Sequence, residues 1–220
     1  MYRAILFDLD DTLYDFYSYR IKRLQSALVK ILKRYKHLDQ DQLISTAIVE
    51  QVYTAQLPAF LRCNGVEDES LIADACDSHA LEWFERMVLA DDTLQTLQTL
   101  HSRFKLGLVT NGPVRIQWSK IERFGLSKHM DTLVISDEVG VAKPDAAIFF
   151  IALERLDVTH AEALFVGDSP EHDLRGAYAA GIPCIWMNRR GASLPTNVPP
   201  PMATIMQLGD LPPLLEKLCI

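Results

Sequence analysis

The chain has 220 residues, enough for one large domain or for a core with a smaller insert. Hydrophobic residues make up 49% and charged residues 23% of the sequence, a balance that is typical of globular proteins and argues against disorder. Lys and Arg number 22 against 29 Asp and Glu, and the formal net charge of −7 disfavours nucleic acid polymers and anionic membranes as general partners.

The first residues are expected to lead into a strand, and no signal peptide is expected among them. Ala4–Phe7 is apolar but too short for the hydrophobic region of a signal peptide. No apolar stretch approaches the roughly 20 residues that a membrane span needs. The four cysteines form no C-x-x-C pair and no zinc-type spacing, so reduced, packed thiols are expected. We therefore expect a cytoplasmic protein, present as a monomer or a homodimer.

Residues 15–91 carry helical patterns. Apolar residues keep helical spacing from Ile21 to Tyr35, and further helices are predicted at about 40–57 and 68–90. The apolar positions of the last helix are Leu81, Phe84 and Val88. Basic residues of the first helix and its end are expected to form a solvated face: Lys22, Arg23, Lys30, Lys33, Arg34 and Lys36. An all-helical stretch inserted after the first strand predicts a separate cap domain.

From residue 92 onward, short apolar runs alternate with helical patterns. Together with Ala4–Phe7, these runs are Leu106–Val109, Leu133–Ile135, Ala163–Val166 and Pro183–Met187. Runs of this kind, bounded by polar turns, are typical of parallel strands buried on both faces. The sequence thus predicts an α/β fold with a doubly wound parallel sheet in a core of residues 1–14 and 92–220, and a helical cap at 15–91.

Turn residues mark the helices between these strands. Pro113 fits a first helical position and Gly125 a helix end. The apolar stripe between them is Val114, Trp118, Ile121 and Phe124. Pro144 is likewise expected to open a helix, and the segment 171–180 is expected to end as a helix at Gly181. The Pro-rich stretch 189–203 predicts a surface loop before a final strand and a short helix.

Chemically active side chains follow the predicted strands. The first strand leads into D-L-D-D-T at 8–12, the second into T-N-G at 110–112, and the fourth into G-D at 167–168. Ligands of open α/β sheets bind at the carboxyl ends of the strands, so one shared site is expected. Its candidates are Asp8, Asp10, Thr110, Asn111, Lys143, Asp168 and Asp173. One D-x-D pattern alone is weak, because Asp39-Gln40-Asp41 repeats it and is expected only to cap a helix.

The content and order of these motifs resemble the haloacid dehalogenase superfamily, in its phosphatase branch with a helical cap after the first motif. The resemblance covers nearly all of the core, and the cap sequence adds nothing to it beyond its position. It implies a Mg²⁺-dependent phosphomonoester hydrolase that forms a phospho-aspartyl intermediate. The partner it implies is a small phosphorylated metabolite.

The chemistry of a phosphate monoester fits these roles. Asp8 is ionised at neutral pH and is expected to attack phosphorus. Asp8 and Asp168 suit a Mg²⁺ that offsets the charge of the ester, and the resemblance adds the backbone carbonyl of Asp10 as a metal ligand. The Asp10 carboxyl is expected to protonate the leaving alcohol and then to activate water.

The remaining candidates suit the transferring phosphoryl group. Thr110 and the backbone N–H of Asn111 are expected to hold its oxygens, and Lys143 to add positive charge in the transition state. Asp173 is expected to orient Lys143 or a metal-bound water. Thr12 is expected to bond the local backbone and fix the loop.

Other functions use similar residues. Asp10 favours a phosphatase over a haloacid dehalogenase, which lacks that second Asp, whereas a phosphomutase or a sugar-phosphate or phosphoglycolate phosphatase would share every motif. A phospho-acceptor domain of the receiver type would carry its residues in another order over about half this length. Nucleoside 5′-monophosphates are the expected substrates, because stretches 7–14, 109–112 and 135–149 look like superfamily nucleotidases and an aromatic cluster could stack on a base. That cluster is Tyr14, Phe16, Tyr17 and Tyr19.

Overall fold

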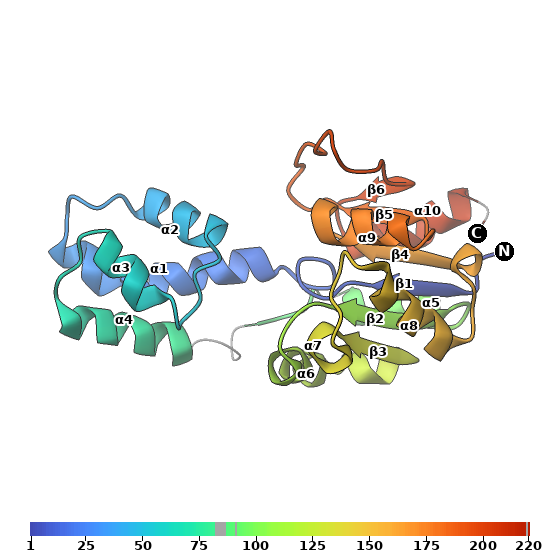
Figure 1. Ribbon diagram of the computed structural model, residues 1–220, viewed down its shortest axis with the longest axis horizontal. Helices are drawn as coiled ribbons and strands as arrows, with labels where there is room; N and C mark the ends of the chain where they lie inside the picture. Colours follow the sequence, from blue (N-terminus) through green and yellow to red (C-terminus); the bar gives the residue numbers. More distant parts are fainter. Residues whose placement is uncertain (82–86, 91, 219) are drawn as a thin grey trace. The chain divides into compact units, whose positions relative to one another are not determined.

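The computed structural model of the protein describes residues 1–81, 87–90, 92–218 and 220. The chain divides into two compact units (Figure 1). Met1–Asp15 together with Val88–Ile220 form the first, here called the sheet unit, and Phe16–Met87 form the second, the helical unit. Within the described ranges, every helix is too short or too polar to span a lipid bilayer.

The sheet unit is built on six parallel strands in the order β3-β2-β1-β4-β5-β6. The strands are β1 (Ala4–Phe7), β2 (Lys105–Thr110), β3 (Thr132–Ile135), β4 (Ala163–Gly167), β5 (Cys184–Met187) and β6 (Ala203–Ile205). This sheet confirms the predicted α/β fold class. The strand runs expected from the sequence agree with β1–β5 to within one residue at either end, and β6 is the expected final strand.

The described residues of the sheet unit form six helices. They are α5 (Thr93–His101), α6 (Val114–Arg123), α7 (Ser136–Val139), α8 (Ala146–Leu156), α9 (Arg175–Ala179) and α10 (Leu211–Lys217). Shorter helical turns are η1 (Leu126–His129), η2 (His160–Glu162), η3 (Pro170–Leu174) and η4 (Leu208–Asp210). Gly125 and Gly181 follow helix ends in left-handed backbone, as expected. Pro144 does not open α8, because the Asp145 carboxylate caps that helix and accepts from the N–H of Ala147 at 2.9 Å. Pro113 likewise precedes α6 and is not its first residue.

The central strand β1 is buried on both faces. Leu6 joins the core under α8 and α9, with Phe149 and Phe165. Ile5 and Phe7 alternate with Leu6 along the strand and are equally buried, so they point to the opposite face, where α5 lies (Figure 1). A strand covered on both faces explains the uninterrupted apolar run that the sequence showed.

The strands end together at one rim. Phe7, the last residue of β1, pairs with Leu108 of β2 and Val166 of β4. The segments that follow β1, β2 and β4 therefore begin at nearly the same level along the strand direction. This register brings residues after position 7, near position 110 and after position 167 side by side.

The helical unit contains α1 (Phe16–Arg34), α2 (Gln40–Val49), α3 (Leu57–Cys63) and α4 (Glu69–Leu81). The helix expected at 40–57 is wrong at its end. It stops at Val49 because Gln51 takes left-handed backbone and the N–H of Val52 bonds back to the carbonyl of Ala47 at 2.8 Å. The helix expected at 68–90 is too long, since Val88 is exposed and non-helical, while Phe84 lies outside the described residues.

Two side chains of the helical unit test sequence expectations. Asp39 caps α2 as expected and accepts from the N–H of Gln42 at 2.8 Å. Arg23 does not lie on a solvated face, because its residue is only 3% exposed. Its guanidinium donates to the carbonyl of His79 at 2.6 Å and to the hydroxyl of Thr54 at 2.9 Å. Arg23 therefore ties α1 to the end of α4 by buried hydrogen bonds.

Candidate functional site

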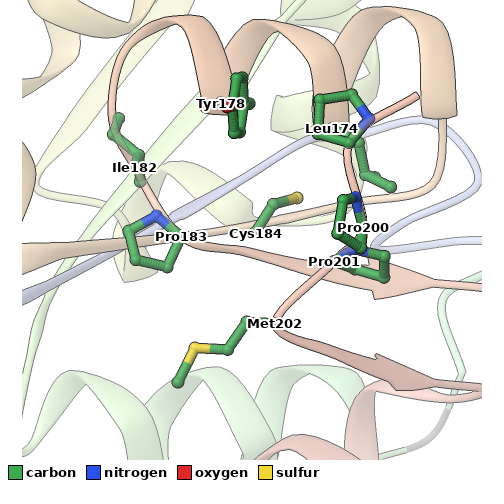
Figure 2. A pocket seen from close by; sticks show the side chains of 9 residues that line it. Leu174, Tyr178, Ile182, Pro183, Cys184, Pro200, Pro201 and Met202 are labelled. Carbon is green, nitrogen blue, oxygen red and sulfur yellow. The ribbon is translucent and has the colours of Figure 1, made fainter. Parts of the chain in front are cut away.

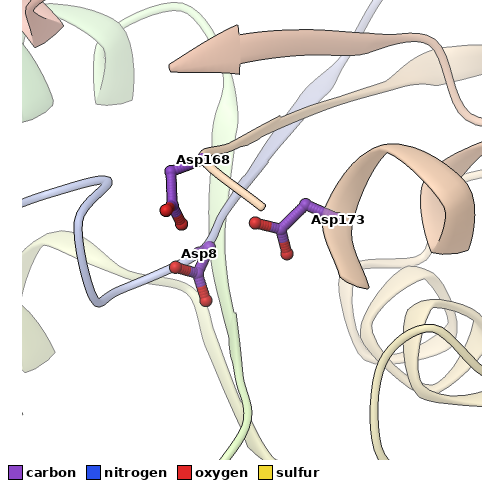
Figure 3. A group of neighbouring side chains, drawn as sticks. All are labelled: Asp8, Asp168 and Asp173. Carbon is purple, nitrogen blue, oxygen red and sulfur yellow. The ribbon is translucent and has the colours of Figure 1, made fainter. Parts of the chain in front are cut away.

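Three carboxylates converge at the rim of the sheet unit. Asp8 follows β1, Asp168 follows β4, and Asp173 lies in the η3 turn (Figure 3). One oxygen from each carboxylate lies within 4.8 Å of the others. Asp8 and Asp173 are buried and Asp168 is half-buried, so bulk solvent screens their charges only partly.

A buried lysine lies between two of these carboxylates. Lys143 comes from the loop between α7 and α8, and its side chain is 3% exposed. Its Nζ donates to Asp8 Oδ1 at 2.5 Å and to Asp173 Oδ1 at 2.7 Å. We call Asp8, Lys143, Asp168 and Asp173 the Asp8 cluster. Three carboxylates face one ammonium, so negative charge is in excess when all are ionised.

Burial and crowding shift the pKa values of this cluster. Burial raises the pKa of Asp8 to about 7, with Lys143 lowering it and Asp173 and Asp10 raising it. Burial, followed by Asp173 and Asp8, also raises the pKa of Asp168 well above its usual range. Burial alone would lower the pKa of Lys143, but Asp173 and Asp8 raise it above its usual range. The lysine thus stays charged, and it is the one cation that contacts these carboxylates among the residues that the structure describes.

The backbone is shaped to admit Asp173. A Cβ on Gly167 would lie 2.5 Å from the Asp173 carboxyl carbon, closer than real Cβ contacts, so only glycine fits at this point. The N–H of Ser169 donates to Asp173 Oδ2 at 2.9 Å. Thr12 differs from its expectation, because its buried hydroxyl donates to Asp8 Oδ2 at 3.3 Å instead of to the backbone.

Thr110 and Asn111 connect β2 to the Lys143 loop. Thr110 is buried at the end of β2. The Asn111 amide donates to the carbonyl of Lys143 and accepts from its N–H, each at 2.9 Å. This reciprocal pair fixes the Lys143 backbone beside the end of β2. The Asn111 side chain therefore fixes the Lys143 loop by hydrogen bonds, a structural role that was not predicted from the sequence.

The Asp10 carboxylate is held by a separate set of donors. Lys120 Nζ lies 2.8 Å from Asp10 Oδ1 and 2.7 Å from Oδ2. Gln117 Nε2 donates to Oδ2 at 3.2 Å, and the Tyr14 hydroxyl donates to Oδ1. We call Asp10, Tyr14, Gln117 and Lys120 the Asp10 cluster. Among the described residues of this cluster, the ammonium of Lys120 contacts the carboxylate of Asp10 at both oxygens.

Gln117 and Tyr14 anchor the Asp10 cluster to its surroundings. Gln117 Nε2 also lies 2.5 Å from Thr110 Oγ1 and 3.0 Å from the carbonyl of Asn111. The Tyr14 ring packs on Phe124 with centroids 4.8 Å apart, and burial followed by Asp10 raises the pKa of Tyr14 well above its usual range. Because Tyr14 is buried and bonded to Asp10, it does not offer an open face on which a base could stack.

Sequence reasoning missed Gln117 and Lys120. The expected stripe on α6 included Val114 and Trp118, which are only half-buried. The buried positions are Gln117, Lys120, Ile121 and Phe124, spaced as one helical face. The sequence did carry a signal for this pair. Gln117 and Lys120 are polar, lie one helical turn apart, and belong to the helix that follows the T-N-G motif at the rim.

A polar hollow of about 240 Å³ opens beside the Asp8 cluster. Its lining includes Asp168, Asp11 and two arginines. Arg189 donates to the carbonyls of Asp11 at 3.0 Å and Thr12 at 2.6 Å, and Arg190 forms an ion pair with Asp11 at 3.3 Å. The C-terminal part of the sheet unit thus holds the loop that carries the first motif.

A second hollow, of about 230 Å³, has different chemistry (Figure 2). None of its nine lining residues is charged, and they include Tyr178, Met202 and the buried Cys184. Such a surface has nothing to bind a phosphate dianion. Cys63 and Cys76 are also free thiols, as expected, and Cys219 lies outside the described residues.

The Asp8 cluster is compatible with a divalent cation. Its three carboxylates offer the hard oxygen ligands that Mg²⁺ prefers, close enough together to share one ion. The raised pKa values of Asp8 and Asp168 mark a place where positive charge would relieve repulsion. The backbone carbonyl of Asp10 as a further ligand stays a prediction.

Known proteins share this sequence pattern. A family model described as haloacid dehalogenase-like hydrolase matches residues 5–187. The glyceraldehyde 3-phosphate phosphatase of Methanopyrus kandleri is 33% identical over 198 residues, which cover 86% of this chain and 85% of the relative. The pyrimidine 5′-nucleotidase YjjG of Escherichia coli is 38% identical over 122 residues, or 55% of this chain and 54% of the relative.

Solved structures share the fold over nearly the whole length. The HAD phosphatase from Thermococcus onnurineus matches with a TM-score of 0.64 at 26% identity and covers 97% of each chain. The 2-haloacid dehalogenase from Pseudomonas syringae pv. Tomato matches with a TM-score of 0.66 at 26% identity, covering 99% of this chain and 100% of that chain.

Proposed function

The chain belongs to the haloacid dehalogenase-like hydrolases, and we propose that it is a phosphatase that hydrolyses small phosphoric monoesters through a phospho-aspartyl intermediate on Asp8. The observation that carries the proposal is the place of Asp8. It leaves the central strand at the rim, with Lys143 on one oxygen, Thr12 on the other, and Asp10 two residues further on. The closeness of a buried carboxylate, a cation and a second carboxyl group supports the proposed roles of Asp8, Lys143 and Asp10.

In the first step, a carboxylate oxygen of Asp8 forms a bond to phosphorus, and the bond from phosphorus to the ester oxygen breaks. Asp10 gives its proton to that oxygen, which leaves as an alcohol. Thr110, the backbone N–H of Asn111 and Lys143 hold the phosphoryl oxygens through the transition state.

In the second step, water attacks the phosphorus of the phospho-aspartyl group. Asp10, now ionised, takes a proton from that water. The bond between phosphorus and the Asp8 oxygen breaks, inorganic phosphate leaves, and the Asp8 carboxylate is restored. One carboxyl group serves both steps because it ends the first in the form that the second needs.

Two further carboxylates support these steps. Mg²⁺, held by Asp8, Asp168 and the carbonyl of Asp10, would supply positive charge against the repulsion between ester and nucleophile. Asp173 holds Lys143 through the 2.7 Å contact, so that the lysine stays charged and in place. Asp173 therefore acts through Lys143 and does not touch the substrate.

Nucleoside 5′-monophosphates remain the proposed substrates. The similarity to a pyrimidine 5′-nucleotidase supports them, while the longer match to a glyceraldehyde 3-phosphate phosphatase supports a sugar phosphate as the alternative. The deciding measurement is kcat/KM for nucleoside monophosphates against hexose phosphates and phosphoglycolate. Nucleotides at or below the level of the small phosphates would reject this substrate. Isomerised sugar phosphate as the product would indicate a phosphomutase.

The Asp8→Asn variant tests the covalent mechanism. The amide keeps the shape of the side chain and loses the nucleophilic anion, so turnover should vanish while the fold persists. In the unaltered protein, rapid acid quenching and mass spectrometry should find one added phosphoryl group on the peptide that contains Asp8. Asp11→Asn is the matched control, three residues along the same loop, and should lose less than about tenfold. Substantial turnover by pure Asp8→Asn protein would falsify the proposal.

A further inference from the structure

We infer that Lys120 is a positioning residue that holds the Asp10 carboxylate where it exchanges protons with the leaving group and with water. The inference rests on the proposed function, in which Asp10 is the acid and then the base. It adds a residue on α6 to a reaction whose other groups come from loops and from the end of β2 at the rim.

The burial of Lys120 is the first argument. Its side chain is only 3% exposed, and lysine is almost never buried unless it is paired. Its Nζ reaches both oxygens of Asp10, at 2.8 and 2.7 Å. Contacts to both oxygens fix the plane of the carboxylate as well as its position. A surface lysine serving solubility would make no such contact.

The setting of Asp10 is the second argument. Its side chain is 25% exposed, and it lies in a loop three residues beyond the end of β1. A partly exposed side chain on a loop ordinarily samples several rotamers. Lys120 restricts Asp10 to one place, and Gln117 and Tyr14 add a donor to each oxygen. Misplacing a reacting group by about 1 Å can cost about 10²-fold in rate.

Gln117 connects the Asp10 carboxylate to the end of β2, which also supports the inference. Its amide contacts Asp10, Thr110 and the carbonyl of Asn111 together. Gln117 and Lys120 are one turn apart on the buried face of α6. Helix α6 therefore contacts both the carboxylate proposed to transfer protons, Asp10, and the groups proposed to hold the phosphoryl oxygens, Thr110 and Asn111.

A positioning role makes the effect of Lys120 depend on the leaving group. p-Nitrophenolate leaves without much protonation, whereas the alkoxide of p-nitrobenzyl alcohol needs a proton from Asp10. The two phosphate esters are similar in size and differ mainly in this need. A general loss of structure would slow both alike, so the ratio of their kcat/KM values separates positioning from folding.

Lys120→Met is the first variant. We expect kcat/KM to fall about 100-fold for p-nitrobenzyl phosphate and less than about tenfold for p-nitrophenyl phosphate. The matched control is Lys105→Met, at the opposite end of β2 from Thr110, where Nζ donates to the carbonyl of Leu156 at 2.6 Å. That variant removes a partly buried lysine remote from the rim and should leave the ratio unchanged.

A double-mutant cycle with Asp10→Asn tests whether Lys120 acts through Asp10. If it does, adding Lys120→Met to Asp10→Asn should cause no further selective loss on p-nitrobenzyl phosphate. Tyr14→Phe is a second route, because it removes one donor to Asp10 and keeps the ring on Phe124. It should change the ratio in the same direction by a smaller factor, even if Lys120→Met does not fold.

The outcomes separate the inference from the proposed function. If Asp10→Asn is selective for p-nitrobenzyl phosphate but Lys120→Met and Tyr14→Phe slow both esters equally, the inference about Lys120 is overturned and the mechanism stands. If Asp10→Asn itself slows both esters equally, the role of Asp10 fails and the inference fails with it.

Discussion

The Asp8 cluster and the Asp10 cluster lie at the same rim, begin two residues apart in the chain, and are organised in opposite ways. Each pairs a carboxylate with a buried lysine, Lys143 in the first and Lys120 in the second. Within the described part of the chain, the Asp8 cluster gathers three carboxylates around one ammonium, whereas in the Asp10 cluster the ammonium of Lys120 contacts both oxygens of a single carboxylate, Asp10. In the first, the described carboxylates outnumber the ammonium groups, whereas in the second an ammonium contacts both oxygens of the Asp10 carboxylate.

The difference shows how neighbours in sequence acquire separate environments. Asp8 meets groups from β4, the η3 turn and the Lys143 loop, while Asp10 meets groups from α6. The proposed mechanism gives this difference a reason. In that mechanism Asp8 attacks phosphorus and lies among crowded carboxylates, whereas Asp10 moves protons and is held by donors from several sides.

Removing the metal should give the largest effect, because it acts on the unbalanced cluster. Exhaustive treatment with EDTA should lower phosphatase activity by about 10³-fold or more, and Mg²⁺ should restore it. Ca²⁺ should inhibit, since its larger and more flexible coordination shell can take both oxygens of Asp8. The measurement is turnover of p-nitrophenyl phosphate before and after adding back each ion. Full activity in EDTA would contradict a metal role for the Asp8 cluster.

Gly167→Ala should give the next largest effect, by pushing Asp173 away from Lys143. Its new Cβ would lie 2.5 Å from the Asp173 carboxyl carbon, and we expect kcat/KM to fall about 10- to 100-fold. The loss should be equal for p-nitrophenyl and p-nitrobenzyl phosphate, unlike the loss in Lys120→Met, because Lys143 serves both esters.

Gly176→Ala is the matched control for that substitution. Its Cβ would lie 2.6 Å from the Phe149 ring in the core under α8 and 3.1 Å from the Cα of Pro144, so it brings similar crowding but meets none of the three carboxylates directly. It should cost stability, of the order of 1–3 kcal/mol, with little change in kcat/KM below the melting temperature. An equal activity loss in both glycine variants would show that general crowding, and not Asp173, controls the rate.

Replacing Asp by Asn in the two clusters should give the smallest of the expected effects. The melting temperature should shift in opposite directions in the two variants. In EDTA, Asp168→Asn should raise Tm by a few degrees, since it removes one of three crowded acidic groups whose mutual repulsion raises the pKa of Asp8 and of Asp168. Asp10→Asn should lower Tm by a similar amount, because it takes the carboxylate from buried Lys120. Each change corresponds to about 1–2 kcal/mol for a chain of this size.

Thermal unfolding of both variants, with and without Mg²⁺, checks this contrast. Adding Mg²⁺ should cancel the advantage of Asp168→Asn, because the variant loses a proposed ligand of the ion. Shifts of the same sign in EDTA would mean that the charge balance assigned to the two clusters is incorrect.

The strands, and the residues that directly follow them at the rim, could be predicted from the sequence because both depend on short-range patterns. A strand buried on both faces is an apolar run, and the chemistry-bearing residues stand directly after such runs. Asp8, Thr110 and Asp168 needed only the order of the elements to be placed together. The parallel sheet then brought them to one edge, as the general rule for open α/β sheets predicts.

The Asp10 cluster could not be predicted in the same way, because it depends on how α6 is rotated about its axis. A helix advances about 100° per residue, so Val114 and Trp118 or Gln117 and Lys120 could have faced the sheet. The apolar stripe favoured the first pair, and contacts with a carboxylate more than a hundred residues earlier favour the second. Arg23 was misplaced for the same reason, since its partner His79 lies far along the chain.

The pairing of β1 has a consequence for the order in which the protein is made. Ala4 pairs with Lys105 on one side and with Ala163 on the other, and Arg189 holds the carbonyl of Thr12. A ribosome therefore completes the whole helical unit, residues 16–87, before either neighbour of β1 exists. The segment that carries Asp8 leaves the exit tunnel ahead of the helical unit and waits for contacts that are made about a hundred residues later or more. Nascent chains stalled before β2 should hold a folded helical unit and an unpaired, apolar first strand, which is the stage at which chaperone binding would matter most.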